Sequence, residues 1–440
     1  MSKIRLIFVI LILTFFCNGL SGQRTYCNSL NLDYGYCPIP NFTESGKHRA
    51  TADPVIVLYK GDYYLFSTNQ WGYWWSTDLN HWNFISKSFL KPYHKVYDDL
   101  CAPAVWVQGD TLLVFGSTYS DNFPIWMSTN PKSNDWKEAI DAFNIGGWDP
   151  DFFTDDDGKL YMYNGSSNAY PLYGVEVDRK TFVPLGARKE LLLLNGERLG
   201  WQRFGEYSDN TFLDAFIEGA WMTKHDGRYF LQYGAPGTEI SGYADGVAVS
   251  DKPLGNFVHQ SMPFSYKPGG FARGAGHGST FQDKWDNYWH VSTISISVKN
   301  SFERRLGLWP AGFDKDPQPV EARYIKLENL HMPTGKFAIS GSRVFGSGHG
   351  SKPDPVSHFI VLRTEKDKRS AWLKWTPVDN AYAYNIYLGT APDKLYNCIM
   401  VYGANEYWLK AMDKEIPYFF RIEAINENGV SQPSQIIKSE

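Results

Sequence analysis

The sequence predicts an all-β chain in two parts, a five-bladed β-propeller followed by a small β-sandwich. The first observation is a repeat: five times, a lead dipeptide is followed by an apolar run, a polar or glycine turn and a second run rich in aromatic residues. The second is that each copy reads as a β-hairpin, at spacings near the roughly 40 to 50 residues of a propeller blade. The third is a separate period-two pattern near the C-terminus.

The five lead dipeptides set the register of the blades. They start 49, 47, 69 and 59 residues apart, at Asp53-Pro54, Ala102-Pro103, Asp149-Pro150, Glu218-Gly219 and His277-Gly278. Equivalent positions of radially repeated blades lie at equivalent distances from the axis. We therefore expect three carboxylates and one imidazole to converge at the mouth of the central channel.

The N-terminus has the features of a secretory signal peptide. Lys3 and Arg5 precede an apolar run that ends at Phe16 and is too short to span a bilayer. We predict removal of residues 1–22, a secreted or periplasmic protein, and no transmembrane segment in the mature chain. Lipoprotein anchoring through Cys17 is not expected, because Phe16 stands where a small residue is needed.

The remaining organisation follows from composition. We expect the propeller over residues 23–344, a linker over 345–357 and the sandwich over 358–440, where Trp375 sits in an alternating strand. The sandwich resembles a fibronectin type III module and is expected to pack without a ligand of its own. The net charge of −4, without a basic stripe, argues against nucleic acid as a partner. Cys27 and Cys37 are close enough to form a disulfide, and free thiols fit equally well.

Three acids around one cavity suit the cleavage of a glycosidic bond. One carboxylic acid protonates the leaving oxygen, while a carboxylate on the other face attacks or activates water. The acid must keep its proton near neutral pH, so burial or a nearby negative charge has to raise its pKa. Asp53, Asp149 and Glu218 can fill these roles. Asp151 competes with Asp149, since period two places both on one side of a strand, but the register favours Asp149.

On these motifs, residues 50–340 resemble glycoside hydrolase family 43, whose members are five-bladed propellers that act with inversion on arabinose- and xylose-containing glycans. The resemblance implies that Asp53, in Ala-Asp-Pro, is the general base. It implies that Glu218, in IEGAWM, is the general acid, and that Asp149, in WDPDFFTDDDG, tunes and orients this acid. No cofactor is required for the chemistry, although His277 would help to hold a structural calcium ion or a water beneath the site.

The resemblance also suggests substrate contacts. Arg304, in FERRLGLWPAGF, falls where members place a substrate-contacting arginine, and Arg305 would point the other way. A glycine-rich approach to His277 can bring Arg273 over the cavity. The second blade opens with Cys101 where many members have tryptophan, so Trp71, Trp74, Trp75 and Trp148 are candidates for the missing aromatic wall against a sugar ring.

The predicted function is therefore a secreted, inverting glycosidase acting on oligo- or polysaccharide. The expected activity is exo-acting α-L-arabinofuranosidase or β-xylosidase on plant cell-wall glycans. The exo assignment depends on an insert of about residues 189–214, which would wall off one end of the cavity. The alternatives are an endo-arabinanase with an open groove, a β-galactosidase, and a non-catalytic glycan-binding propeller.

Overall fold

The structure is a computed structural model that describes residues 28–36, 48–68, 71–94, 99–119, 123–143, 148–210, 212–270, 272–296, 302–314, 325–327 and 350–439. The predicted signal peptide, Cys17, Cys27, Cys37 and residues 345–349 of the predicted linker lie outside these residues. Within them, no helix has the length and hydropathy needed to cross a membrane.

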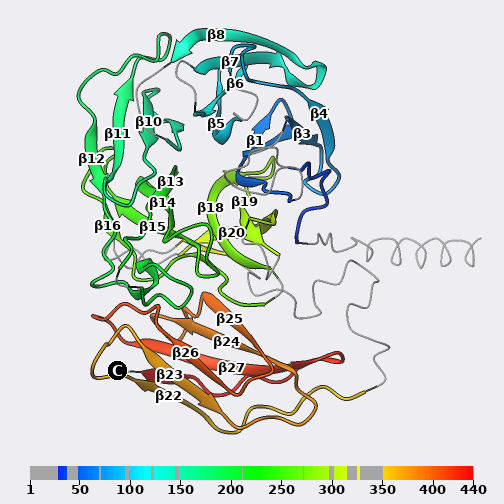
Figure 1. The fold of residues 1–440 in the computed structure, drawn as a ribbon, viewed down its shortest axis with the longest axis vertical. Coiled ribbons are helices and arrows are strands. Elements are labelled where there is room, and N and C mark those ends of the chain that lie inside the picture. The colour runs from blue at the N-terminus through cyan, green and yellow to red at the C-terminus, as the bar shows by residue number, and fades with distance from the viewer. Residues whose placement is uncertain are drawn as a thin grey trace, which may run out of the picture.

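Five antiparallel sheets surround a central axis, which confirms the predicted five-bladed propeller (Figure 1). Each sheet is one blade, and its first strand lies nearest the axis. In chain order the strands are β1 (Ala52–Tyr59), β2 (Asp62–Thr68), β3 (Gly72–Ser76) and β4 (Asn83–Ser86); β5 (Cys101–Gln108), β6 (Thr111–Ser117), β7 (Phe123–Asn130) and β8 (Asp135–Phe143); β9 (Asp151–Thr154), β10 (Leu160–Asn164), β11 (Leu172–Val177) and β12 (Lys189–Leu192); β13 (Glu218–His225), β14 (Arg228–Ala235), β15 (Ala244–Ser250), β16 (Val258–His259) and β17 (Ser265–Tyr266); β18 (Arg273–Gln282), β19 (Tyr288–Ser295), β20 (Arg304–Phe313) and β21 (Ile325–Leu327).

The hairpins form where the sequence places turn residues between apolar runs. Lys60 and Gly61 both have positive φ, as do Asp226 and Gly227, which suits the tight turns that match strand twist. The apolar faces pack between blades, as in the stack of Trp106 of blade 2 on Phe152 of blade 3 at 4.2 Å between ring centroids. Burial of these faces holds the inner strands at fixed positions around the axis.

Hydroxyl groups join successive blades next to the axis. The backbone N–H of Ala102 donates to Thr68 Oγ1 at 2.6 Å, and that of Asp149 donates to Ser117 Oγ at 2.9 Å. The N–H of Asp53 donates to Thr293 Oγ1 at 2.9 Å, which joins blade 5 back to blade 1. These bonds fix the backbone at the predicted lead positions.

The register places Glu218 one residue away from the position we predicted. Asp53, Ala102, Asp149 and His277 all adopt positive φ at the start of their blades, and in blade 4 the residue that does so is Gly219. Glu218 pairs with Gly234 in the ladder, before the bulge, as Ala52, Cys101 and Gly276 do in their blades. Its side chain therefore enters the site from a different position than the two aspartates.

The C-terminal region is a two-sheet sandwich, as predicted. One sheet has three strands, in the order β22 (Phe359–Arg363), β23 (Ala371–Trp375) and β26 (Glu406–Leu409). The other contains β25 (Asn397–Tyr402), β24 (Ala383–Gly389), β27 (Tyr418–Asn426), β28 (Gly429–Val430) and β29 (Ile437–Ser439). Trp375 is buried between them, with its ring edge-to-face on Tyr384 at 5.1 Å.

The insert between blades 3 and 4 fastens this sandwich to the propeller (Figure 1). The N–H of Gly200 donates to the carbonyl of Met412 at 2.9 Å, and Arg198 pairs with the fully buried Asp413 at 2.8 Å. Trp201 of the insert and Tyr418 of the sandwich belong to one continuous hydrophobic core. The two domains therefore pack as one unit.

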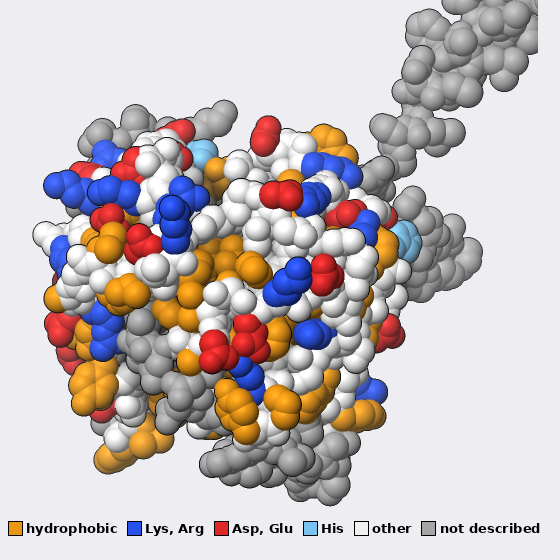
Figure 2. Space-filling model, turned by 90° about the horizontal axis from the view of Figure 1, so that it is seen from above, with side chains coloured by type: hydrophobic (Ala, Val, Ile, Leu, Met, Phe, Trp, Pro, Cys, Tyr) orange, Lys and Arg blue, Asp and Glu red, His pale blue; other side chains and the backbone are white. Residues whose placement is uncertain are grey.

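The surface carries both signs of charge. On the face shown in Figure 2, lysine and arginine side chains are interspersed with aspartate and glutamate, and the residues described there form no continuous basic stripe. Apolar side chains gather in patches between these charges.

Candidate active site

Asp53 lies at the start of β1 with both carboxylate oxygens engaged. Thr68 Oγ1 donates to Oδ2 at 2.6 Å, and His277 Nδ1 lies 3.1 Å from Oδ1. The threonine that donates here also accepts the N–H of Ala102. The hydroxyl that joins blades 1 and 2 therefore also orients this carboxylate.

Asp149 is buried and faces blade 4. Its Oδ2 accepts the N–H of Gly219 at 3.3 Å and lies 3.8 Å from His277 Nδ1. Burial raises the pKa of Asp149 to about 8; the charge of His277 opposes the shift, whereas the carboxylates of Glu218 and Asp53 add to it.

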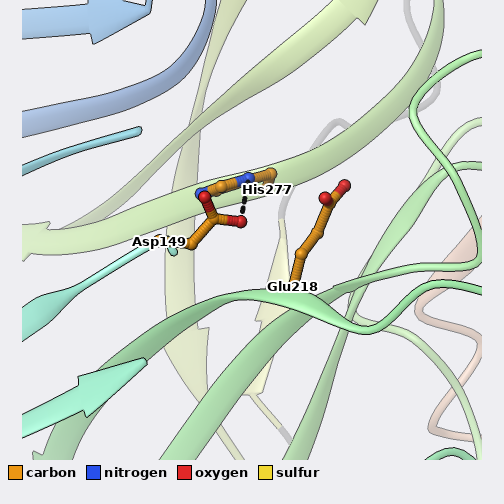
Figure 3. Close-up of side chains that lie close together, drawn as sticks. All are labelled: Asp149, Glu218 and His277. Atoms are coloured by element: carbon orange, nitrogen blue, oxygen red, sulfur yellow. Dashed lines mark ion pairs between the residues drawn. The ribbon is translucent and has the colours of Figure 1, made fainter. Parts of the chain in front are cut away.

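Glu218 is the third carboxylate of the cluster. Tyr243 Oη donates to its Oε1 at 2.6 Å, and Ser166 Oγ donates to its Oε2 at 3.2 Å. Burial raises the pKa of Glu218, against the lowering effects of His277 and the Tyr243 hydrogen bond. A ligand atom from each of Glu218, Asp149 and His277 lies within 4.8 Å of the others (Figure 3).

His277 supplies the positive charge among these acids. Burial alone would lower its pKa, but Asp53, Asp149 and Glu218 together raise it to about 9, so the imidazole is protonated at neutral pH. The ring packs against Gly219, where a Cβ would lie 2.5 Å from His277 Cδ2. Glycine is thus required at 219 by both the positive φ and this close contact.

A family model now identifies the chain. The model for glycosyl hydrolases family 43 matches residues 47–318, which is more than half of the sequence and includes all four residues of the cluster. The chain belongs to glycosyl hydrolase family 43. It is therefore a glycoside hydrolase, and the alternative of a non-catalytic propeller is not retained.

Relatives of this family 43 hydrolase differ in their named activities. A β-D-galactofuranosidase, xynD, of Aspergillus niger is 27% identical over 156 residues, 35% of this chain and 36% of that protein. The chain therefore spans only about a third of that relative's length. In fold, the chain resembles a thermostable family-43 glycoside hydrolase, with a TM-score of 0.52 and 19% identity over 63% of this chain and 93% of the other.

A second solved structure covers both domains. The Bacteroides ovatus xyloglucan PUL GH43B has a TM-score of 0.52 and 15% identity over 94% of this chain and 92% of its own. An endo-1,4-beta-xylanase from Bacteroides thetaiotaomicron has a TM-score of 0.52 and 20% identity over 64% of this chain and 95% of its own. These likenesses show the fold alone.

The two hydrogen-bond donors to Glu218, Tyr243 and Ser166, could not be predicted from the sequence. Tyr243 follows a loop of blade 4 outside the repeated motif, and Ser166 follows β10 in blade 3. Neither belongs to a recognisable pattern, so only the fold places their hydroxyls on the carboxylate. Asp151, which competed with Asp149 in the sequence, accepts the N–H of Met222 at 2.9 Å and has its pKa raised to about 7 by burial.

The predicted arginines lie at the start of two strands of blade 5. Arg304 is only 3% exposed, and its guanidinium donates to Thr238 Oγ1 at 3.0 Å and to the carbonyl of Ala50 at 2.6 Å. Arg273 donates to Ser241 Oγ at 2.6 Å. Arg305 points the other way, toward Glu303 at 2.8 Å, as strand alternation predicts. Substrate contact by Arg304 and Arg273 stays a prediction.

The predicted tryptophans have different surroundings. Trp148 directly precedes Asp149 and, with Ser166 and Tyr170, lines a cavity of ≈ 360 Å³. Trp71 is 39% exposed in the loop after β2, at the end of the sheet where Asp53 lies. Trp74 is fully buried, and Trp75 lies in β3 with Lys132 Nζ 4.1 Å above its ring. These contacts describe packing for Trp74 and Trp75, and a substrate role for Trp71 and Trp148 stays a prediction.

The donor set near His277 does not suit calcium. Calcium takes about six to eight oxygen ligands, whereas the one cluster of potential metal ligands found among the described residues consists of Asp149, Glu218 and an imidazole. His277 Nδ1 lies 3.1 Å from Asp53 Oδ1, and Glu218 is bonded to two hydroxyls. The proposed reaction uses the side chains of the cluster alone.

Proposed function

We propose that this family 43 hydrolase is an exported, inverting, exo-acting glycosidase that releases α-L-arabinofuranosyl or β-xylosyl units from plant glycans. The observation that carries the proposal is the cluster of Asp53, Asp149 and Glu218 around a protonated His277. It combines an acid whose pKa is raised with a second carboxylate, Asp53, that Thr68 and His277 hold in place. That is the pair of groups that inverting cleavage requires.

In the proposed reaction, Glu218 carries the acid proton and transfers it to the oxygen of the departing sugar. Asp53, oriented by Thr68 and His277, removes a proton from the water that attacks the anomeric carbon from the opposite face. Asp149 accepts the N–H of Gly219 next to Glu218, and the protonated His277 lies beside both acids. Burial raises the pKa of Glu218 and so favours the protonated form that a general acid needs.

Furanosides are the substrate class that we favour. The A. niger relative is named a β-D-galactofuranosidase, so a galactofuranoside belongs in the substrate panel beside the arabinofuranoside and xyloside. The exo assignment depends on the insert of about residues 189–214. Its first residues, Lys189–Leu192, form β12 of blade 3, and the part that follows is held by the sandwich through Arg198 and Gly200.

Release of 4-nitrophenol from aryl glycosides tests the proposal. The panel contains the α-L-arabinofuranoside, β-D-xyloside, β-D-galactofuranoside and β-D-galactoside, with wild type compared with Asp53→Asn. We expect turnover of one furanoside or of the xyloside, and its loss in Asp53→Asn by about 10²-fold or more, as for removal of a general base. Equal turnover by the two proteins would contradict the role of Asp53.

A further inference from the structure

A cavity of ≈ 440 Å³ lies where the insert, the loop after β10 and the C-terminal sandwich meet. Arg203 and Leu213 come from the insert, Tyr170 from the loop and Arg369 from the sandwich. Its volume falls in the range of small-molecule sites, about 300 to 1,000 Å³. None of the four clustered residues of the active site lines it.

The cavity shares a wall with the catalytic acid. Ser167 and Ile217 exchange two backbone hydrogen bonds of 3.0 Å, and both line the cavity. Their chain neighbours, Ser166 and Glu218, meet on the catalytic side, where Ser166 donates to the Glu218 carboxylate. Because successive residues of an extended chain point to opposite sides, the backbone of Ser167 and Ile217 separates the cavity from the Glu218 carboxylate. Ser167 and Tyr170 also line the cavity that contains Trp148 and Ser166, so the two cavities adjoin at these residues. A long glycan that leaves on the side of Glu218 and Ser166 can extend past Tyr170 into the interdomain cavity.

The lining is that of a carbohydrate site. Tyr170 is 66% exposed and Leu213 is 59% exposed, and such apolar surfaces suit the C–H faces of sugar rings. Asn168, Glu197 and Asp214 supply polar groups for hydroxyls. Arg203 and Arg369 both pair with Asp367, and Glu197 and Asp214 add negative charge to the lining, so a neutral glycan fits better than an acidic one.

The walls are held in place by contacts between the domains. Asp367 accepts Arg203 Nη1 at 3.0 Å and Arg369 Nε at 2.7 Å. Arg369 Nη1 also donates to the carbonyl of Gly196 at 2.7 Å, and Arg203 Nη2 to that of Lys410 at 2.8 Å. A site whose side chains are already fixed loses less conformational entropy when it binds.

We propose that this interdomain cavity binds the leaving-side sugars of a neutral glycan, and that the C-terminal sandwich completes it through Arg369. The inference rests on the proposed function, because it takes Glu218 as the acid. It makes an oligo- or polysaccharide the natural substrate and gives the sandwich a part in substrate selection.

The test compares a 4-nitrophenyl glycoside with neutral oligosaccharides of increasing length that carry the same terminal sugar. For the wild type, kcat/KM should rise with length by about tenfold, which corresponds to ~1.4 kcal/mol. Tyr170→Ala removes the exposed ring, and Leu213→Trp fills the cavity. Both should abolish most of this rise and leave kcat/KM for the aryl glycoside within about twofold, or ~0.4 kcal/mol.

Two control variants are available. Tyr402→Ala removes a tyrosine that is 51% exposed on the sandwich, and Trp285→Ala removes a tryptophan that is 56% exposed in the turn between β18 and β19. Both should keep the dependence on length. The inference is overturned if wild-type kcat/KM does not rise with length, or if Tyr170→Ala and Leu213→Trp lower the rates for both substrates equally.

Failure of the proposed function would be seen separately. In that case no aryl glycoside is hydrolysed, and calorimetric titration of the full chain with the longest oligosaccharide replaces the kinetic comparison. Binding by the wild type that Leu213→Trp weakens by about tenfold, ~1.4 kcal/mol, supports the cavity. Equal affinities, or no binding, refute it.

Discussion

The hydrogen bond from Tyr243 to Glu218 should set the alkaline limit of activity. It stabilises the carboxylate and therefore opposes the burial that raises the pKa of Glu218. A hydrogen bond to a charged group contributes about 1.5 to 3 kcal/mol, against about 0.5 to 1.5 for a neutral partner. Tyr243→Phe removes a difference of about 1 kcal/mol, so the pKa of the acid should rise by roughly 0.7 units at ~1.36 kcal/mol per unit.

The assay is the pH profile of kcat/KM on an aryl glycoside with a poor leaving group, which depends on the acid. Because a group with a higher pKa keeps its proton to a higher pH, the alkaline limb of Tyr243→Phe should move upward. Tyr59→Phe is a matched control, since its hydroxyl donates to the carbonyl of Asp110 at 2.7 Å, away from the site. An unmoved limb, or one that moves to lower pH, would refute the assigned role of Tyr243.

The remaining predictions concern stability. Burial raises the pKa of Asp151 to about 7, so the folded state binds an extra proton and the free energy of unfolding falls as pH rises from about 4 to 7. Asp151→Asn should therefore raise Tm at pH 8 and have little effect at pH 4, and no change at pH 8 would contradict this. Asp155→Asn should lower Tm near neutral pH, because Lys224 and Tyr229 hold the pKa of Asp155 down despite burial; an unchanged Tm would argue against that pairing. Thr293→Val should cost about 1 kcal/mol in chemical denaturation by removing the bond that joins blade 5 to Asp53, and full stability would show that the bond is dispensable.

Much of the fold could be predicted because every blade repeats the same local pattern. Apolar runs, glycine turns and lead dipeptides lie close together in sequence, so the positions of Asp53, Asp149 and His277 followed from the register. The period-two pattern around Trp375 likewise predicted the sandwich. In each of these cases the decisive signal is local.

The features that the sequence did not predict depend on contacts between residues that are far apart in the chain. Glu218-Gly219 reads like the Asp-Pro leads, yet the positive φ and the close approach of His277 place the glycine, and not the acid, in the equivalent position. Tyr243 reaches Glu218 only because β15 follows a loop back toward the axis. The insert packs against Asp413 and Met412, more than 200 residues later in the chain, and no local pattern indicates such a partner.

The most direct test of the central claim is a leaving-group series on Glu218→Gln, measured as kcat/KM for aryl glycosides of one sugar. Leaving groups of low pKa need little protonation, so the variant should approach the wild-type rate with them and fall progressively behind as the leaving-group pKa rises. A loss of the same size for every leaving group, or no loss at all, would contradict Glu218 as the acid.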